Sequence, residues 1–139
     1  MMLVLDASMA LAWIFARPTP SEQDCADRAL QFLHGAVARV PAIWQVEVAN
    51  GLLVGERRHV VTAAQSSDYL RRLDQLVILA DAAEGAAHRD AVMRIARQYD
   101  LSAYDASYLE LALRLSAPLA TFDRKLAGAA QAAGGAVFA

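Results

Sequence analysis

Residues 101–125, LSAYDASYLELALRLSAPLATFDRK, decide how the chain folds. This stretch predicts a helix that begins near Ser102 and carries Asp105 in its first turn. A strand from Pro118 to Phe122 follows, and Asp123 lies where that strand ends and the last helix begins. In an open parallel sheet a helix runs antiparallel to the strand that it precedes, so both acids fall at one edge. Ligands bind at that edge, outside the carboxyl ends of the strands.

Apolar runs and helical patterns alternate along the rest of the chain. Short apolar runs predict strands over residues 2–5, 37–40, 77–80 and 136–138. Helical patterns cover residues 7–16, 21–35, 43–58, 62–76, 83–98 and 124–133, with expected caps at Ser21 and Thr62. This alternation predicts an α/β fold, a three-layer sandwich around a mostly parallel sheet. We expect residues 1–139 to form a single domain, because 139 residues leave little room for a second core.

Composition and charge exclude several classes of protein. The chain is 57% hydrophobic and 20% charged, which predicts a folded globule, and its net charge of -2 creates no field that attracts a polyanion. Nucleic-acid binding therefore needs a local basic patch or bound cations. Cys25 is the only cysteine, so we expect a reducing compartment. The N-terminal residues carry no Lys or Arg before Arg17, and no apolar run reaches the roughly 20 residues that span a bilayer. We expect a cytoplasmic protein without a membrane anchor.

Four acids from distant parts of the sequence are predicted to meet at the carboxyl edge of the sheet. Asp6 ends the first strand, and Glu47 lies on the helix that starts where the second strand ends, so both join Asp105 and Asp123. Two carboxylates about 4 Å apart repel each other by roughly 4 kcal/mol at an effective dielectric constant near 20. No Lys or Arg adjoins Asp6, Glu47 or Asp105 in the sequence. A divalent cation is therefore the expected counter-charge, and Mg²⁺ or Mn²⁺ suits a site made of carboxylates.

Each of these acids also has a structural explanation. Asp105 follows Ser102 by three residues and could complete a capping box, and Asp123 could serve only as the N-cap of the last helix. Glu47 is harder to explain that way, because its helical neighbours include Ile43 and Val54, and an unpaired Glu on an apolar stripe is costly. The functional interpretation depends on the four acids sharing an edge.

The remaining charged and polar residues have simpler interpretations. Asp81 also ends a strand, but we expect it to cap a helix, and His34, His59 and His88 show no metal-ligand spacing. The sequence contains no glycine-rich phosphate loop and no Ser or Cys nucleophile motif. Arg124 and Lys125 adjoin Asp123 and could hold a phosphate backbone.

Three segments carry a resemblance to a known family. These are LVLDAS at 3–8, VPAIWQVEVANGLL at 40–53 and LSAYDASYLELALRLSAPLATFDRKL at 101–126. Together they resemble PIN-domain ribonucleases, and more closely the VapC toxins of bacterial toxin-antitoxin pairs. The resemblance implies a PIN-like sheet of five strands in the order 3-2-1-4-5. It also implies an acidic quartet and assisting polar residues at the following positions: Asp6, Glu47, Asp105 and Asp123, with Ser8, Asn50 and Thr121.

The resemblance further implies a metal-dependent endoribonuclease that leaves 5′-phosphate and 3′-hydroxyl ends. In that activity Asp6 and Asp105 are the expected principal metal ligands, Asp123 is a further ligand, and Glu47 binds the ion or orients the attacking water. The implied partners are an RNA substrate, an antitoxin protein and a second copy of the chain. We expect the antitoxin groove among the helices that carry Trp13, Phe15, Trp44 and Leu53.

Two other functions use the same acids. A phosphatase would use Asp6 as its nucleophile, but the sequence Asp6-Ala7-Ser8 lacks a second acid two places on. A non-catalytic receiver module would hold a regulatory ion and place a Lys after a late strand. The only lysine, Lys125, lies two residues past Asp123, on the wrong side of the turn. The nuclease is the function that the sequence favours.

Overall fold

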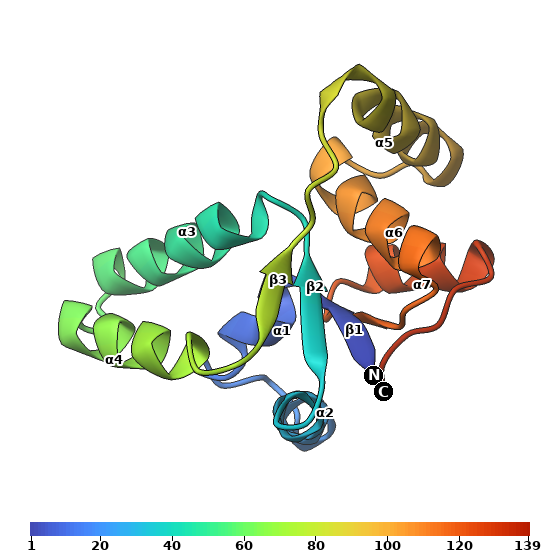
Figure 1. Ribbon diagram of the computed structural model, residues 1–139. Helices are drawn as coiled ribbons and strands as arrows, with labels where there is room; N and C mark the ends of the chain where they lie inside the picture. Colours follow the sequence, from blue (N-terminus) through green and yellow to red (C-terminus); the bar gives the residue numbers. More distant parts are fainter.

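A computed structural model describes all 139 residues, which form four strands and seven helices (Figure 1). The strands are β1 Met2–Leu5, β2 Val37–Val40, β3 Ile78–Ala80 and β4 Leu119–Ala120. The helices are α1 Ala7–Leu11, α2 Pro20–Leu33, α3 Trp44–Arg57, α4 Ala63–Leu73, α5 Gly85–Tyr99, α6 Ala103–Leu115 and α7 Arg124–Ala132.

The strands form one parallel sheet in the order β3-β2-β1-β4. The central strand β1 pairs with β2 on one side, where Leu3 lies opposite Ala38, and with β4 on the other, where Val4 lies opposite Leu119. These four side chains have no exposed surface. A strand that is covered on both faces reads as a continuous apolar run, which is how the sequence located β1 correctly.

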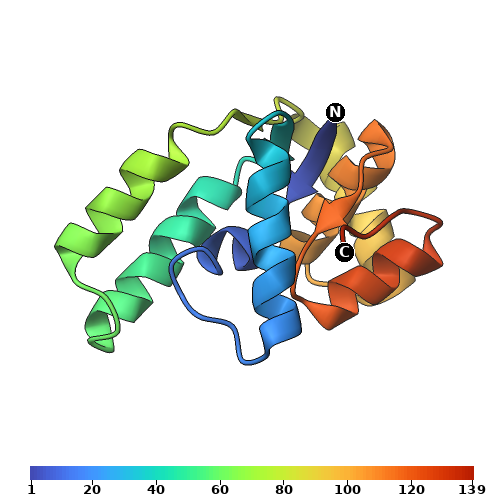
Figure 2. The same cartoon turned by 90° about the horizontal axis from the view of Figure 1, so that it is seen from below.

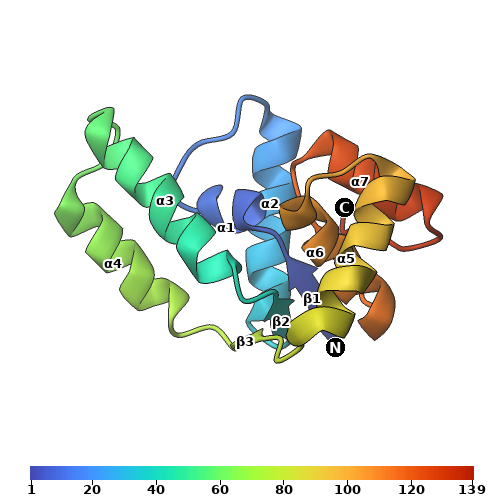
Figure 3. The same ribbon diagram turned by 90° about the horizontal axis from the view of Figure 1, so that it is seen from above.

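Helices cover both faces of the sheet, as the three-layer prediction requires. Helices α1 to α4 lie on one side and α5 to α7 on the other (Figures 1 and 3). Helix α2 runs between α1 and the C-terminal segment (Figure 2), where the rings of Phe32 and Phe138 meet edge to face with their centroids 5.6 Å apart. Helix α6 packs directly on β1 and β4, and α5 packs on α6. The sheet edge that carries the acids therefore lies between α3 and α6.

The prediction of five strands is wrong in detail. Segment 136–138 forms only one parallel bridge, between Val137 and Leu119, at the expected position of a fifth strand. It cannot pair further because β4 is two residues long, shorter than the predicted 118–122. Pro118 has no N–H to donate to a ladder. At the other end, Phe122 N donates to Ser8 Oγ (3.0 Å) rather than to a neighbouring strand. The hydrogen bonds that end β4 early are those that build the site.

Two further predictions about helices need correction. Helix α1 ends at Leu11 instead of Ala16, and beyond it Trp13 Nε1 donates to Ala26 O (2.8 Å), which turns the chain toward α2. The N-cap of α2 is Thr19 rather than Ser21, since the Thr19 side chain accepts a hydrogen bond from Glu22 N. The capping box predicted at Thr62 is confirmed.

Helix α3 approaches α1 closely enough to bring Glu47 toward Asp6. Gly51 makes this possible, because a Cβ at this position would lie 2.5 Å from Leu11 Cδ1. Trp44, in the first turn of α3, is completely buried, so it contacts the core and not a partner surface. Its indole anchors the helix in the core instead.

None of the seven helices combines the length and hydrophobicity that crossing a membrane requires.

Candidate active site

A pocket of about 570 Å³ lies beyond the carboxyl ends of β1 and β2, between α3 and the start of α6. All four predicted acids line it, together with Ser8 and Asn50. The acids come from four separate segments of the chain: Asp6, Glu47, Asp105 and Asp123. The topology thus brings together the side chains that the sequence placed at one edge.

Asp6 is the most deeply buried of these acids, with 6% of its surface exposed. Ser8 Oγ and Thr121 Oγ1 both donate to Asp6 Oδ2, each at 2.6 Å. The same hydroxyls accept backbone N–H groups, Ser8 from Phe122 and Thr121 from Asp123 at 3.0 Å. The loop after β4 is therefore fixed to Asp6 by two side chains, and neither hydroxyl uses the second carboxylate oxygen, Oδ1.

Glu47 lies in the first turn of α3 and is held by a residue that the sequence analysis missed. Tyr108 is completely buried on α6, and its hydroxyl donates to Glu47 Oε1 at 2.5 Å. Tyr108 follows Asp105 by three residues, so both lie on one face of α6. This helical spacing was the only signal in the sequence that could have identified it.

Asp105 and Asp123 are placed by helix caps. Ser102 caps α6 by accepting the Asp105 N–H (3.1 Å), a bond that involves the Asp105 backbone and leaves its carboxylate free. Asp123 caps α7 itself, because its Oδ1 accepts from Leu126 N (2.9 Å). The structural explanation of Asp123 is therefore correct, but this acid also faces the pocket.

The electrostatics of the pocket favour a cation. Burial raises the pKa of Asp6, and the hydrogen bonds from Ser8 and Thr121 oppose the increase only in part. The pKa of Asp105 is raised by burial and then by the negative charges of Asp123 and Asp6. Burial also raises the pKa of Glu47, where the bond from Tyr108 acts in the opposite direction. These carboxyls gain from a positive charge, and hard oxygen donors fit a divalent cation such as Mg²⁺.

The four acids share a pocket but are not arranged as a finished chelate. No group of three or more His, Cys, Asp or Glu side chains is positioned to hold one metal ion. The donor chemistry and the charge fit an ion, whereas the side-chain positions require rotation or bridging waters. Mg²⁺ commonly keeps several waters and binds only one or two carboxylates, so this arrangement is compatible with it.

Other predicted residues take different places. Lys125 lies outside the pocket and pairs with Asp100, Nζ to Oδ2 at 3.3 Å, and Arg124 is exposed nearby. Asp81 does not cap a helix as expected, because its carboxylate receives two hydrogen bonds from Arg114, at 3.1 and 2.6 Å. Glu84 is the N-cap residue of α5 instead.

Comparison with known proteins identifies the family. Residues 3–132 match the PIN domain family model. The chain belongs to the PIN-domain family. It is 33% identical over 131 residues to "VapC ribonuclease Mb0985" of Mycobacterium bovis and to "Ribonuclease VapC9" of Mycobacterium tuberculosis. Each alignment covers 94% of this chain and 93% of the relative. This PIN domain is therefore a relative of VapC ribonucleases over almost its entire length, as the sequence motifs implied.

Solved structures share the fold. This PIN domain is similar to the crystal structure of PAE2754 from Pyrobaculum aerophilum, with a TM-score of 0.66 and 25% identity, covering 93% of this chain and 79% of that one. It is also similar to the crystal structure of FitAcB from Neisseria gonorrhoeae, with a TM-score of 0.63 and 21% identity, covering 100% and 97% of the two chains. The PIN fold that the motifs predicted is confirmed.

Proposed function

We propose that this chain is a metal-dependent endoribonuclease and the toxin of a toxin-antitoxin pair. One observation carries the proposal: four acids from remote segments of a PIN domain line the same pocket. The similarity to VapC ribonucleases over 94% of the chain supports RNA as the substrate. The phosphatase and the receiver module lose support, since these relatives are ribonucleases by name.

In the proposed site each acid has a distinct role. Asp6 and Asp105 are the principal ligands of a divalent cation, Mg²⁺ or Mn²⁺, and Asp123 is a further ligand. The Ser8 and Thr121 hydroxyls hold Asp6 by Oδ2, which would leave Oδ1 available to a cation. Glu47 either binds the ion or accepts a hydrogen bond from the attacking water, and Tyr108 holds it in place for this role.

The bound ion supplies Lewis acidity, which promotes ionisation of water and stabilises negative charge on the phosphodiester. The ion also lets an acidic pocket receive an anion, because RNA phosphates would otherwise meet carboxylates that already repel one another; burial first, and then the charges of Asp123 and Asp6, raise the pKa of Asp105. The side chains contribute position and charge, and the expected products carry 5′-phosphate and 3′-hydroxyl ends.

Cleavage of total RNA tests the proposal. The purified protein should cut RNA in Mg²⁺ or Mn²⁺ but not in EDTA, and Asp6→Asn and Asp105→Asn should abolish cleavage while Glu47→Gln weakens it. Asp74→Asn, an exposed acid at the end of α4, is the matched control and should cleave like wild type. Cleavage that persists in EDTA, or in Asp6→Asn, would refute the proposal.

The proposed antitoxin has a candidate surface outside the carboxylate pocket. A groove of about 600 Å³ runs between Trp13 and α4 and is lined by Val60, Val61, Tyr69 and Arg72. Val60 is 64% exposed. An exposed apolar side chain at the border of a groove is suited to contact with a partner protein. A small neighbour-encoded protein should co-purify with the wild type, and Val60→Asp should lose it while retaining its fold.

We place the pair in the cytoplasm, where RNA is available. We also propose a homodimer, which size-exclusion chromatography with light scattering should detect.

A further inference from the structure

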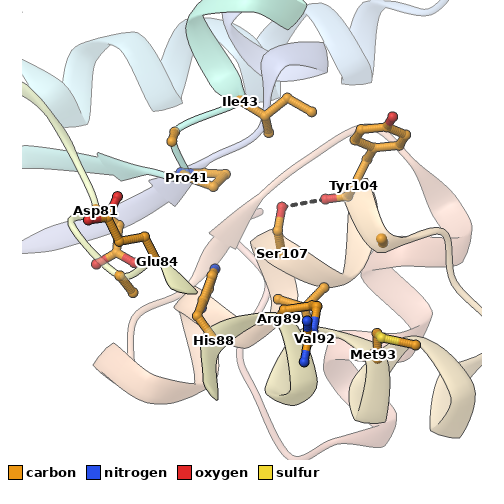
Figure 4. Close-up of a pocket in the computed structure, with 13 residues that line it drawn as sticks. Pro41, Ile43, Asp81, Glu84, His88, Arg89, Val92, Met93, Tyr104 and Ser107 are labelled. Atoms are coloured by element: carbon orange, nitrogen blue, oxygen red, sulfur yellow. Dashed lines mark hydrogen bonds between the residues drawn. The ribbon is translucent and has the colours of Figure 1, made fainter. Parts of the chain in front are cut away.

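A second cavity adjoins the carboxylate pocket and has no part in the mechanism described above. It has a volume of about 350 Å³ and lies between the loops that follow β2 and β3, the first half of α5 and the start of α6 (Figure 4). Figure 4 shows Pro41 and Ile43 on one side and His88, Val92 and Met93 of α5 on the other. An open, mainly apolar cavity of this size falls at the small end of ligand pockets, about 300–1,000 Å³.

The two cavities share a wall. Ile43 and Tyr104 line both of them, and Tyr104 immediately precedes Asp105 in the first turn of α6. The two cavities therefore adjoin each other at Ile43 and Tyr104. A polymer bound across the carboxylate pocket can place its adjacent unit in this cavity.

Tyr104 is an unusual residue for such a position. It is an aromatic side chain with 62% of its surface exposed, and its hydroxyl forms no hydrogen bond within the chain. Its backbone is fixed, because it lies in α6 and its carbonyl accepts from Ser107 Oγ at 2.6 Å. An exposed ring that borders a cavity, on a residue whose backbone is held in a helix, is a suitable surface for stacking a planar group.

The rim of the cavity carries polar groups that a planar, hydrogen-bonding ligand can use. Glu84 and Arg89 are exposed at its border, and His88 points into it (Figure 4). Asp81 also lines the cavity, but Arg114 already engages both of its oxygens. The cavity thus combines apolar walls, one exposed aromatic ring and polar side chains at its rim, which suits a nucleobase better than a charged peptide or a lipid chain.

We propose that this cavity is a nucleobase subsite, in which Tyr104 stacks on the base next to the scissile phosphodiester. The subsite rests on the proposed ribonuclease function and makes it more specific, since it names a residue that determines where RNA is cut. Single-stranded RNA is commonly recognised by splayed bases that stack on aromatic side chains. Such stacking contributes about 1–3 kcal/mol per base, which corresponds to roughly 5- to 140-fold in binding.

Abasic substitution in a short RNA tests the subsite. The substrate is a 12-nucleotide RNA that contains one mapped cleavage site, and each nucleotide near the cut is replaced in turn by an abasic residue. Wild-type protein should lose roughly 5- to 140-fold in kcat/KM at one flanking position. Tyr104→Ala should lose a similar factor on the intact RNA, with no further loss on the abasic RNA, whereas Tyr104→Phe should retain the wild-type pattern. Leu79→Ala, which removes an exposed apolar side chain from β3, is the matched control.

Binding gives a readout independent of turnover. A 2-aminopurine at the sensitive position should be quenched on binding to Asp6→Asn protein and should lose that quenching when Tyr104→Ala is added. The subsite would be overturned if Tyr104→Ala and the abasic residue lowered kcat/KM independently, so that their losses added. It would also be overturned if no abasic position changed kcat/KM. Either result would leave the nuclease intact. Absence of cleavage by wild type in Mg²⁺ and Mn²⁺ would instead refute the nuclease, and the subsite with it.

Discussion

Replacing Tyr108 by Phe removes one hydroxyl from the site and leaves the packing of α6 unchanged. The Tyr108 ring is completely buried, so Phe fills the same space, and the loss is confined to the 2.5 Å hydrogen bond to Glu47. A hydrogen bond to a charged group contributes about 1.5–3 kcal/mol. Water can partly replace it because Glu47 is half-buried, so the free energy of unfolding should fall by about 1–2 kcal/mol. For a chain of 139 residues this lowers Tm by roughly 3–10 °C.

The same change should alter the pH dependence of RNA cleavage. The Tyr108 hydrogen bond lowers the pKa of Glu47 against the effect of burial, so its loss raises that pKa further. Glu47 then stays protonated to a higher pH, and the acidic limb of the cleavage profile should move upward. Loss of a residue that positions a metal-site carboxylate commonly costs about 10- to 100-fold in activity or metal affinity.

Urea unfolding and a pH–rate profile measure the two effects, and Tyr69→Phe is the matched control. Tyr69 is also buried and donates its hydroxyl, to Ala10 O at 2.5 Å, but it lies away from the acids. Its loss should destabilise the protein without moving the acidic limb. An unchanged limb in Tyr108→Phe, or an equal shift in Tyr69→Phe, would show that Tyr108 supports the fold and not the site.

Three further predictions concern the charges. The raised pKa values of Asp6, Glu47 and Asp105 mean that the folded state binds protons more tightly than the unfolded state, so their contribution to stability falls as pH rises through those values. Thermal melts in EDTA should show this decline as the pH rises above about 4, the ordinary pKa of these carboxyls, and Mg²⁺ should reduce it. Asp6→Asn should make stability fall less steeply with pH, raise Tm at neutral pH and abolish cleavage. A lower Tm would mean that the buried charge of Asp6 is stabilising. Arg114→Met should lower the free energy of unfolding by about 1–3 kcal/mol, since it removes the hydrogen bonds that Arg114 donates to Asp81 and to the buried Glu110, and calorimetry should detect the loss.

The sequence predicted the elements whose side chains show clear periodicity or caps. Strand β1 was located to the residue because its apolar run is covered on both faces, and Ser102 and Thr62 cap the helices that they were expected to cap. The ends of α1 and β4 could not be predicted, because long-range contacts determine both. Trp13 reaches Ala26 across the turn after α1, and Ser8 binds Phe122 N from 114 residues away.

The candidate site also contains residues that the sequence could predict and residues that it could not. Asp6, Glu47, Asp105 and Asp123 could be assigned to one edge because the topology of a parallel sheet alone brings them there. Tyr108 was missed, because its spacing from Asp105 places both residues on one face of α6 but does not show how α6 is rotated against α3. The burial of Trp44 could not be predicted for a similar reason, because an aromatic residue at a helix start is equally consistent with the core and with the surface.

The most direct test of the central claim is anomalous diffraction from crystals grown or soaked with Mn²⁺. The acids line one pocket without forming a ready chelate, so direct binding of an ion by Asp6 and Asp105 would require their side chains to rotate. We predict a manganese peak within about 2.0–2.6 Å of Asp6 and Asp105 oxygens, the distance range for hard cations and carboxylates. A protein that cleaves RNA in Mn²⁺ but shows its manganese elsewhere, with these carboxylates still apart, would contradict the account.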